Sequence, residues 1–101
     1  MLNEYISKIG NVVDKVKNAT FEVKINDIKI IENNNDIAVI MEVQDKTGTI
    51  KALLVGEREE LIDIMNNLKT GNEYRIRGNI SILDDELISG KTLVIKAIEQ
   101  I

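Results

Sequence analysis

The side chains that could carry out chemistry are few in this 101-residue chain, because it contains neither histidine nor cysteine. Imidazole acid–base catalysis, imidazole and thiolate metal ligands and disulfides are therefore excluded together. The three serines, Ser7, Ser81 and Ser89, have no histidine to activate them as nucleophiles. The acidic run at residues 84–86 lacks the fixed ligand spacing of a calcium loop. We therefore expect no enzymatic activity, no metal and no other cofactor.

Basic side chains are the remaining functional candidates, although the chain carries a net charge of −4. That charge argues against a protein whose whole surface is basic and binds a nucleic-acid duplex. Basic residues nevertheless recur in the segments with strand character, where they could form a modest basic stripe that contacts phosphate. The members of this stripe are Lys24, Lys46, Lys51, Arg75, Arg77 and Lys96.

Hydrophobic periodicity predicts the elements that must position these side chains. Apolar residues at spacings of three and four predict a short amphipathic helix over residues 2–9. From Phe21 the period becomes two, so a first strand is expected to begin there. A change of parity near Asn26-Asp27 predicts a β-bulge that bends this long strand, and the polar residues 32–36 predict a hairpin loop.

The rest of the chain alternates between strand patterns and turns, with one helix. A second strand is predicted over residues 37–44, with Ile37, Val39, Met41 and Val43 on its inner face. Phe21 and Tyr74 fall on the apolar phase of their strands and are predicted to be core residues. The other predicted elements are a tight turn at residues 45–48, a strand at 49–55, a helix at 57–68, a strand at 74–82, a loop at 83–91 and a strand at 92–98.

The order of three strands, a helix and two strands is that of the five-stranded Greek-key OB barrel. An SH3-like barrel has no three-turn helix at this point, and a ferredoxin-like domain would need two crossover helices. The sequence therefore predicts an all-β fold with one or two helices. We expect a lead-in segment at residues 1–20, with the short N-terminal helix, and an OB-fold domain at residues 21–101.

Two motifs resemble the signatures of OB-fold nucleic-acid-binding domains. The first runs from Asp45 to Lys51 (DKTGTIK), and the second runs from Gly71 to Gly78 (GNEYRIRG). The chain is most similar to the OB domains of archaeal replication protein A and of bacterial DNA polymerase III alpha subunits. The match covers residues 20–101, and residues 5–20 resemble the lead-in segment of the replication protein A type.

The resemblance implies that single-stranded DNA lies across the second and third strands, between the loop after the first strand and the loop before the fifth. It assigns nucleic-acid contacts to matching positions, to which the basic stripe adds Lys24. The predicted site residues are Lys24, Lys46, Thr47, Lys51, Arg75 and Arg77. Strongly binding members of the family place an aromatic residue at the end of the third strand, where this chain has Leu53, Leu54 and Val55. Since base stacking contributes about 1–3 kcal/mol per base, its loss lowers the expected affinity.

The distribution of charge leaves alternatives open. The segments 32–36, 83–91 and 57–69 are each net acidic, and acidic loops would repel phosphate, so we expect weak, salt-sensitive binding. Lys46 and Lys51 could instead keep an edge hairpin soluble. Arg75 and Arg77 could pair with neighbouring acids rather than touch a ligand.

The sequence thus predicts a non-catalytic module that binds single-stranded nucleic acid, most simply DNA, in a replication or repair protein. Other OB domains or replication proteins are possible further partners, and a cytoplasmic location is expected. The alternative is an OB domain that docks a protein and has lost its stacking residues, and the motifs do not separate DNA from RNA. No membrane partner is expected, because no apolar run approaches the roughly 20 residues of a membrane span. No small-molecule substrate is expected either.

Overall fold

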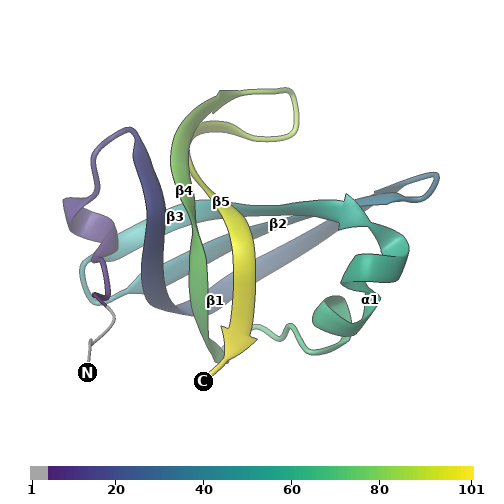
Figure 1. Cartoon of the computed structure of the whole chain (residues 1–101), viewed down its shortest axis with the longest axis horizontal. Coiled ribbons are helices and arrows are strands. Elements are labelled where there is room, and N and C mark those ends of the chain that lie inside the picture. The colour runs from purple at the N-terminus through teal and green to yellow at the C-terminus, as the bar shows by residue number, and fades with distance from the viewer. Residues whose placement is uncertain (1–4) are drawn as a thin grey trace.

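Five strands close into a barrel in the computed structural model, which describes residues 5–101 (Figure 1). The neighbours around the barrel are β1, β2, β3, β5, β4 and β1 again. The elements in chain order are η1 (Ile9–Asn11), β1 (Val16–Asn33), β2 (Asp36–Asp45), β3 (Gly48–Glu57), α1 (Arg58–Asn66), β4 (Glu73–Asp84) and β5 (Ser89–Gln100). The predicted order of three strands, a helix and two strands is confirmed.

β1 is the longest strand and serves both halves of the barrel. Its first half pairs with β4 and its second half pairs with β2, both antiparallel. The register with β2 shifts between Ile25 and Asp27, which confirms the predicted bulge. A bulge bends a strand and increases its twist, so one strand can take part in both halves of a small barrel. β1 begins at Val16, earlier than the predicted start at Phe21.

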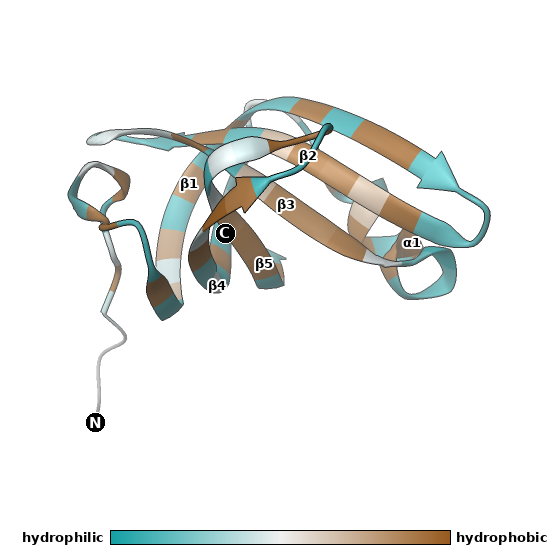
Figure 2. Cartoon of the chain, turned by 90° about the horizontal axis from the view of Figure 1, so that it is seen from above, coloured by the Kyte–Doolittle hydropathy of each residue, from teal (hydrophilic) through white to brown (hydrophobic). Residues whose placement is uncertain are grey.

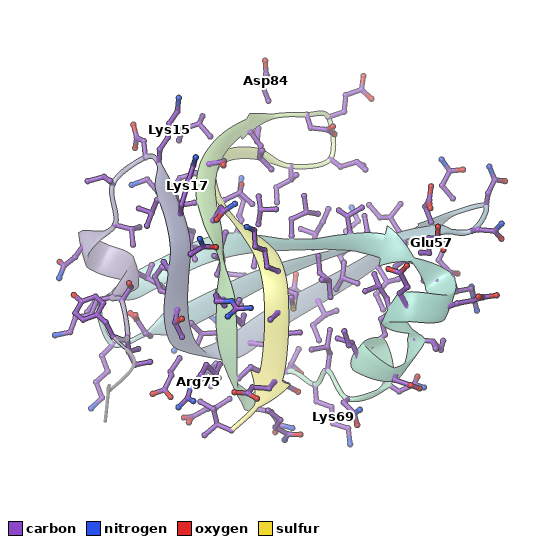
Figure 3. The ribbon with its side chains drawn as sticks, viewed as in Figure 1. Lys15, Lys17, Glu57, Lys69, Arg75 and Asp84 are labelled. Carbon is purple, nitrogen blue, oxygen red and sulfur yellow. The ribbon has the colours of Figure 1, made fainter. Side chains whose placement is uncertain are left out.

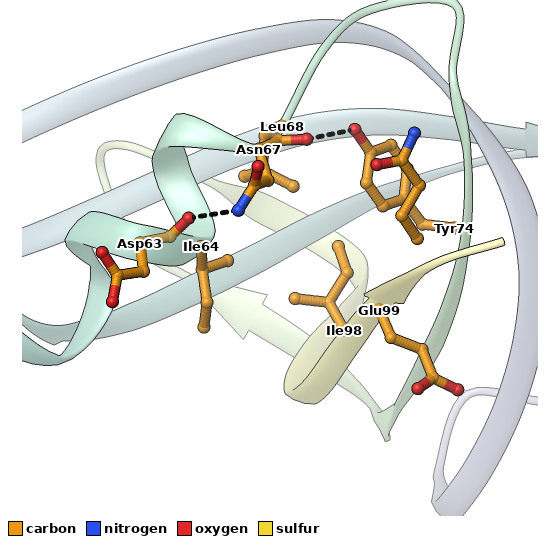
Figure 4. Close-up of a pocket in the computed structure, with 8 residues that line it drawn as sticks. Asp63, Ile64, Asn67, Leu68, Tyr74, Ile98 and Glu99 are labelled. Atoms are coloured by element: carbon orange, nitrogen blue, oxygen red, sulfur yellow. Dashed lines mark hydrogen bonds between the residues drawn. The ribbon is translucent and has the colours of Figure 1, made fainter.

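The core is aliphatic apart from two aromatic side chains. Phe21 and Tyr74 are buried, as predicted, and so are the four inner residues of β2. The Tyr74 hydroxyl donates to the Asn67 carbonyl at 2.6 Å and accepts from the Lys69 amide at 2.9 Å. Tyr74 also lines a cavity of about 310 Å³ between α1, the start of β4 and the end of β5 (Figure 4). Its hydroxyl is therefore already paired within the protein and is not free for a ligand in this cavity.

The predicted helix over residues 2–9 is wrong over residues 5–8, which are not helical, and residues 1–4 lie outside the described chain. Only a single 3-10 turn, η1, is present at Ile9–Asn11. The Ser7 amide donates to the Thr20 carbonyl at 2.7 Å, and the amides of Ile9 and Gly10 donate to side chains of the β2–β3 turn. These tertiary hydrogen bonds use the backbone groups that a helix would need, and a helix this short is marginal by itself.

α1 connects β3 to β4 at one end of the barrel, near the predicted position (Figure 1). It buries Leu61, and Gly71 adopts a φ of +87° in the turn that follows. Its first turn carries Glu59 and Glu60, whose charges favour the helix N-terminus. Within residues 5–101, no helix is long and apolar enough to cross a membrane.

The hairpin connections are shorter than predicted. β4 continues to Asp84 and β5 begins at Ser89, so only residues 85–88 connect them rather than the predicted 83–91. The turn between β1 and β2 likewise reduces to Asn34 and Asn35, and Asn34 adopts a φ of +56°. The polar residues 32–36 suggested a loop, but they also fit the exposed end of a hairpin.

Candidate nucleic-acid interface

The predicted site residues do not form one surface. Lys24 and Lys46 line a recess of about 360 Å³ beside the β2–β3 turn, with Glu22 and Glu73. Lys51 lies in a groove beneath the β4–β5 loop. Arg75 and Arg77 lie on the outer face of β4, and Thr47 is held within the β2–β3 turn.

Asp45 and Thr47 tie the β2–β3 turn to the lead-in segment. One oxygen of the Asp45 carboxylate accepts from the Thr47 amide at 2.7 Å, the Thr47 hydroxyl at 2.5 Å and the Gly48 amide at 3.2 Å. The other oxygen accepts from the Ile9 amide at 2.9 Å. The Thr47 hydroxyl accepts in turn from the Gly10 amide at 2.8 Å. We name this set of hydrogen bonds the Asp45 clip, because it fixes the turn and η1 together.

The Asp45 clip requires a glycine at position 10 and lowers the pKa of Asp45. A Cβ at Gly10 would lie 2.6 Å from the Thr47 carbonyl oxygen, so only glycine allows this approach. Partial burial raises the pKa of Asp45, but the hydrogen bonds from Ile9, Thr47 and Gly48 outweigh burial and leave that pKa below its ordinary value. The first motif of the sequence therefore has a structural role in this chain, whatever else it contacts.

The groove is a cleft of about 290 Å³ between the outer face of β1, β2 and β3 and the β4–β5 loop. It is lined by Asp27, Lys29, Ile40, Met41, Glu42, Lys51, Glu86, Leu87, Ile88 and Ser89. Two lysines thus face three carboxylates. The Lys51 ammonium donates to the Ser89 carbonyl at 2.8 Å and so connects the sheet to the loop.

The strand register explains this mixture of charges. Asp27, Glu42 and Lys51 are direct cross-strand neighbours on β1, β2 and β3, so one row holds two acids and then a base. The next outer rows are largely aliphatic, and Figure 2 shows that apolar residues of both faces recur along β2 and β3. Those outer rows contain Lys29, Ile31, Ala38, Ile40, Leu53 and Val55. No aromatic residue occurs in them, in agreement with the prediction of a missing stacking platform.

The two arginines of the second motif have different neighbours. Arg75 donates to the Glu22 carboxylate at 2.7 Å and lies 3.8 Å from that of Glu99. Arg77 forms no ion pair with any described residue and faces an open hollow of about 770 Å³ on the outer face of β1, β4 and β5. Ion pairing, one of the two predicted alternatives, therefore describes Arg75 and not Arg77.

Sequence reasoning missed three residues that line these surfaces. Lys29 belongs to the groove, and Lys17 and Tyr5 belong to the hollow. Figure 3 shows Lys17 on β1 next to β4, and Arg75 towards the other end of β4. For Lys17 the sequence offered one signal. Lys17 and Asn18 are two polar residues in succession, and they interrupt the alternation of a strand.

No protein-family model matches the chain, and no curated protein matches it in sequence. Solved structures do match its fold. It is similar to the second OB-fold domain of replication protein A from Methanococcus maripaludis, with 17% identity, a TM-score of 0.71 and coverage of 96% of this chain and 95% of that one. It is also similar to part of a replication protein A heterotrimer bound to single-stranded DNA, with 17% identity, a TM-score of 0.67 and coverage of 95% and 24%.

A third similar structure is Pot1pC of Schizosaccharomyces pombe bound to single-stranded DNA, with 12% identity, a TM-score of 0.56 and coverage of 96% and 86%. A closed five-stranded barrel with a helix between β3 and β4 defines one class of small β-barrel domains. The fold is the OB fold, and the predicted likeness to archaeal replication protein A domains is confirmed at the level of structure.

Proposed function

We propose that this OB domain binds single-stranded nucleic acid, with DNA as the preferred ligand and the groove as a contact surface. The observation that carries the proposal is the outer face of β1, β2 and β3, where Lys24 and Lys29 on β1 and Lys51 on β3 lie beside aliphatic rows. None of the three forms an ion pair within residues 5–101. Two structures similar to this chain are bound to single-stranded DNA, which supports the same ligand class.

The charges of the groove set the expected strength. Lys29 and Lys51 can each neutralise one phosphate, but Asp27, Glu42 and Glu86 lie within the same cleft and oppose a polyanion. Aliphatic side chains replace the aromatic platform, so stacking adds little. We expect weak binding that falls with salt. In this proposal the domain is non-catalytic and belongs to a replication or repair protein, where tethering to further OB domains raises effective affinity.

Fluorescence anisotropy of labelled strands of about 20 nucleotides, DNA and RNA separately, tests the proposal at about 50 and 150 mM salt. We expect saturable binding that weakens with salt. The variant Lys29→Gln/Lys51→Gln should weaken it, whereas Arg58→Gln/Lys69→Gln removes equal charge outside the groove and should change it less. Absence of saturable binding at low salt would contradict the function. Equal effects of the two variants would contradict the groove.

A second candidate function is protein docking, and one observation favours it. The same outer face and loop expose aliphatic side chains, among them Val55 and Leu87. Exposed aliphatic rows beside acidic loops suit a protein partner better than a phosphate backbone. If no nucleic acid binds, an interaction partner of this face becomes the leading hypothesis, and Val55→Asp should then abolish its binding.

A further inference from the structure

A second surface of the barrel has the charge that the groove lacks. The hollow on the outer face of β1, β4 and β5 is lined by Tyr5, Ser7, Val16, Lys17, Asn18, Ala19, Thr20, Arg77 and Lys96. Three of these side chains are cationic, and no described residue of the lining is acidic. In a chain with a net charge of −4, such a cluster is not explained by overall composition.

Two β-bulges on either side of Gly78 bring these cations together. On β1, Lys17 and Asn18 lie between the residues paired with Ile80 and Gly78, where β4 has only Asn79. On β5, Lys96 lies between the residues paired with Gly78 and Arg77 and has no residue opposite it. A bulge places an extra residue outside the regular alternation, so these side chains stay on the outer face.

The geometry of the bulges is fixed by specific contacts. Asn18 adopts a φ of +53°, and its amide donates to the Asn79 side chain at 2.9 Å. The Lys96 ammonium lies 3.4 Å from the Asn18 side-chain oxygen, which joins the two bulges across β4. A Cβ at Gly78 would lie 2.2 Å from the Val94 carbonyl oxygen, so β4 and β5 can approach this closely only at a glycine.

Two acids on the strands that form this surface are already engaged. Glu22 and Glu99 lie on the neighbouring strands β1 and β5, and both pair with Arg75. Arg77, two residues along β4, is left without an acidic partner among the described residues. The positive charge of the hollow is therefore available to a ligand. A concave surface of one charge concentrates its field and attracts an ion of opposite charge.

The hollow also holds the exposed aromatic residue. Of the three aromatic side chains in the sequence, Phe21 and Tyr74 are buried, while Tyr5 is 80% exposed at the edge of the hollow. The hydrogen bond from the Ser7 amide to Thr20 holds this segment against β1. Aromatic side chains beside cations are the combination that binds single strands, because bases stack on rings while phosphates meet charges.

We infer that the hollow binds single-stranded nucleic acid, with phosphates on Lys17, Arg77 and Lys96 and a base stacked on Tyr5. This inference rests on the proposed function and adds to it a contact surface outside the groove. Each phosphate contact with a single strand contributes about 0.7 to the slope of log affinity against log salt.

The test is fluorescence anisotropy of the full chain with a labelled strand of about 20 nucleotides over a range of salt. The hollow variant Arg77→Gln/Lys96→Gln should lower the salt slope by about 1.4. The matched variant Arg58→Gln/Lys69→Gln loses the same number of positive charges, at residues that line neither the hollow nor the groove. Its slope of log affinity against log salt should therefore hardly differ from that of the wild type. Tyr5→Ala should raise the Kd about fivefold or more, and Tyr5→Phe should not.

The outcomes separate this inference from the proposed function. If the wild-type chain binds and the hollow variant matches the control variant, the hollow is not a binding surface and the groove proposal stands. If the chain binds no strand at low salt, both are overturned. Labelling with fluorotyrosine gives a direct check by NMR, because the chain has two tyrosines. The Tyr5 signal should shift on binding and the buried Tyr74 signal should not. The reverse would overturn the inference.

Discussion

The groove and the hollow are two concave surfaces of one barrel, and they differ in how their charges are balanced. In the groove, Lys29 and Lys51 share the cleft with three carboxylates. In the hollow, three cations occur without an acid among the described lining residues. The groove lies where the resemblance implies a ligand, while the hollow has the more suitable charges for phosphate.

The difference has a cause in strand pairing. Regular antiparallel pairing places side chains directly opposite one another, and opposite charges are the favourable cross-strand choice, as for Glu42 and Lys51. Bulges remove a residue from this pairing, as they do for Lys17 and Lys96. Opposite charges therefore meet across the regular pair of Glu42 and Lys51, whereas Lys17 and Lys96 accumulate at bulges without an acid opposite them.

The largest effect is expected from closing the space that the bulges need. Gly78→Ala introduces a Cβ that would meet the Val94 carbonyl oxygen at 2.2 Å, so β4 and β5 must separate. We expect the free energy of unfolding to fall by about 3 kcal/mol in urea titration. Gly71→Ala, where backbone strain occurs without a contact, should cost only about 1 kcal/mol. Equal losses would contradict the packing argument.

The next largest effect concerns the Asp45 clip, which holds the segment beside the hollow and does not line the groove. Asp45→Ala removes the acceptor of four hydrogen bonds, and we expect the free energy of unfolding, measured by urea titration, to fall by about 2 kcal/mol. Asp63→Ala removes an exposed carboxylate and should change stability by less than about 0.5 kcal/mol. A wild-type stability in Asp45→Ala would show that the clip is dispensable.

The clip also predicts a dependence on pH. The folded-state pKa of Asp45 lies below its ordinary value, so the contribution of its carboxylate is full above the unfolded-state pKa of about 3.9. It is lost as pH falls through the lower, folded-state pKa. The stability difference between wild type and Asp45→Asn should therefore be constant near neutrality and shrink only below about pH 4. A difference that persists unchanged into strong acid would contradict this account.

A smaller effect is expected from making the groove resemble the hollow. Asp27→Asn/Glu86→Gln removes two of the three carboxylates in the cleft, and we expect strand binding at about 50 mM salt to tighten about fivefold. Asp63→Asn/Glu59→Gln makes the same change of charge on α1 and serves as the control. If both variants tighten binding equally, net charge rather than the groove is responsible.

The smallest effect distinguishes two residues of one strand. Arg77→Gln should lower the salt slope by about 0.7, because one phosphate contact is lost. Arg75→Gln should leave the slope nearly unchanged and cost less than about 1 kcal/mol of stability, because its ion pairs are partly exposed. Equal slopes for the two variants would remove the distinction between paired and available arginines.

Much of the fold could be predicted from local patterns. Alternation identified the inner face of β2, the parity change near Asp27 identified the bulge, and the helical spacing after Glu57 identified α1. The start of the chain could not be predicted in this way. An apolar stripe suggested a helix over residues 2–9, but over residues 5–11 hydrogen bonds to Thr20, Asp45 and Thr47 decide the conformation, and these partners are distant in sequence.

The candidate site was predictable by residue type and not by location. Lys51 and Arg77 were both identified as basic residues on strands, yet they lie on different surfaces of the barrel. The pairing of Arg75 with Glu22 depends on the register between β1 and β4, which local periodicity does not specify. Lys17 was missed because it precedes the predicted first strand, in a segment where the alternation is broken.

The parallel contact between β3 and β5 spans only residues 51–53 of β3. Before that contact along β3, η1 lies against Gly48. After it, Leu61 of α1 lies against Gly56. A long exposed strand edge invites another chain to add to the sheet and starts aggregation. η1 and α1 therefore lie against the parts of β3 on either side of its contact with β5. Because the Asp45 clip holds η1 in place, we expect its loss to favour aggregation as well as to loosen the fold.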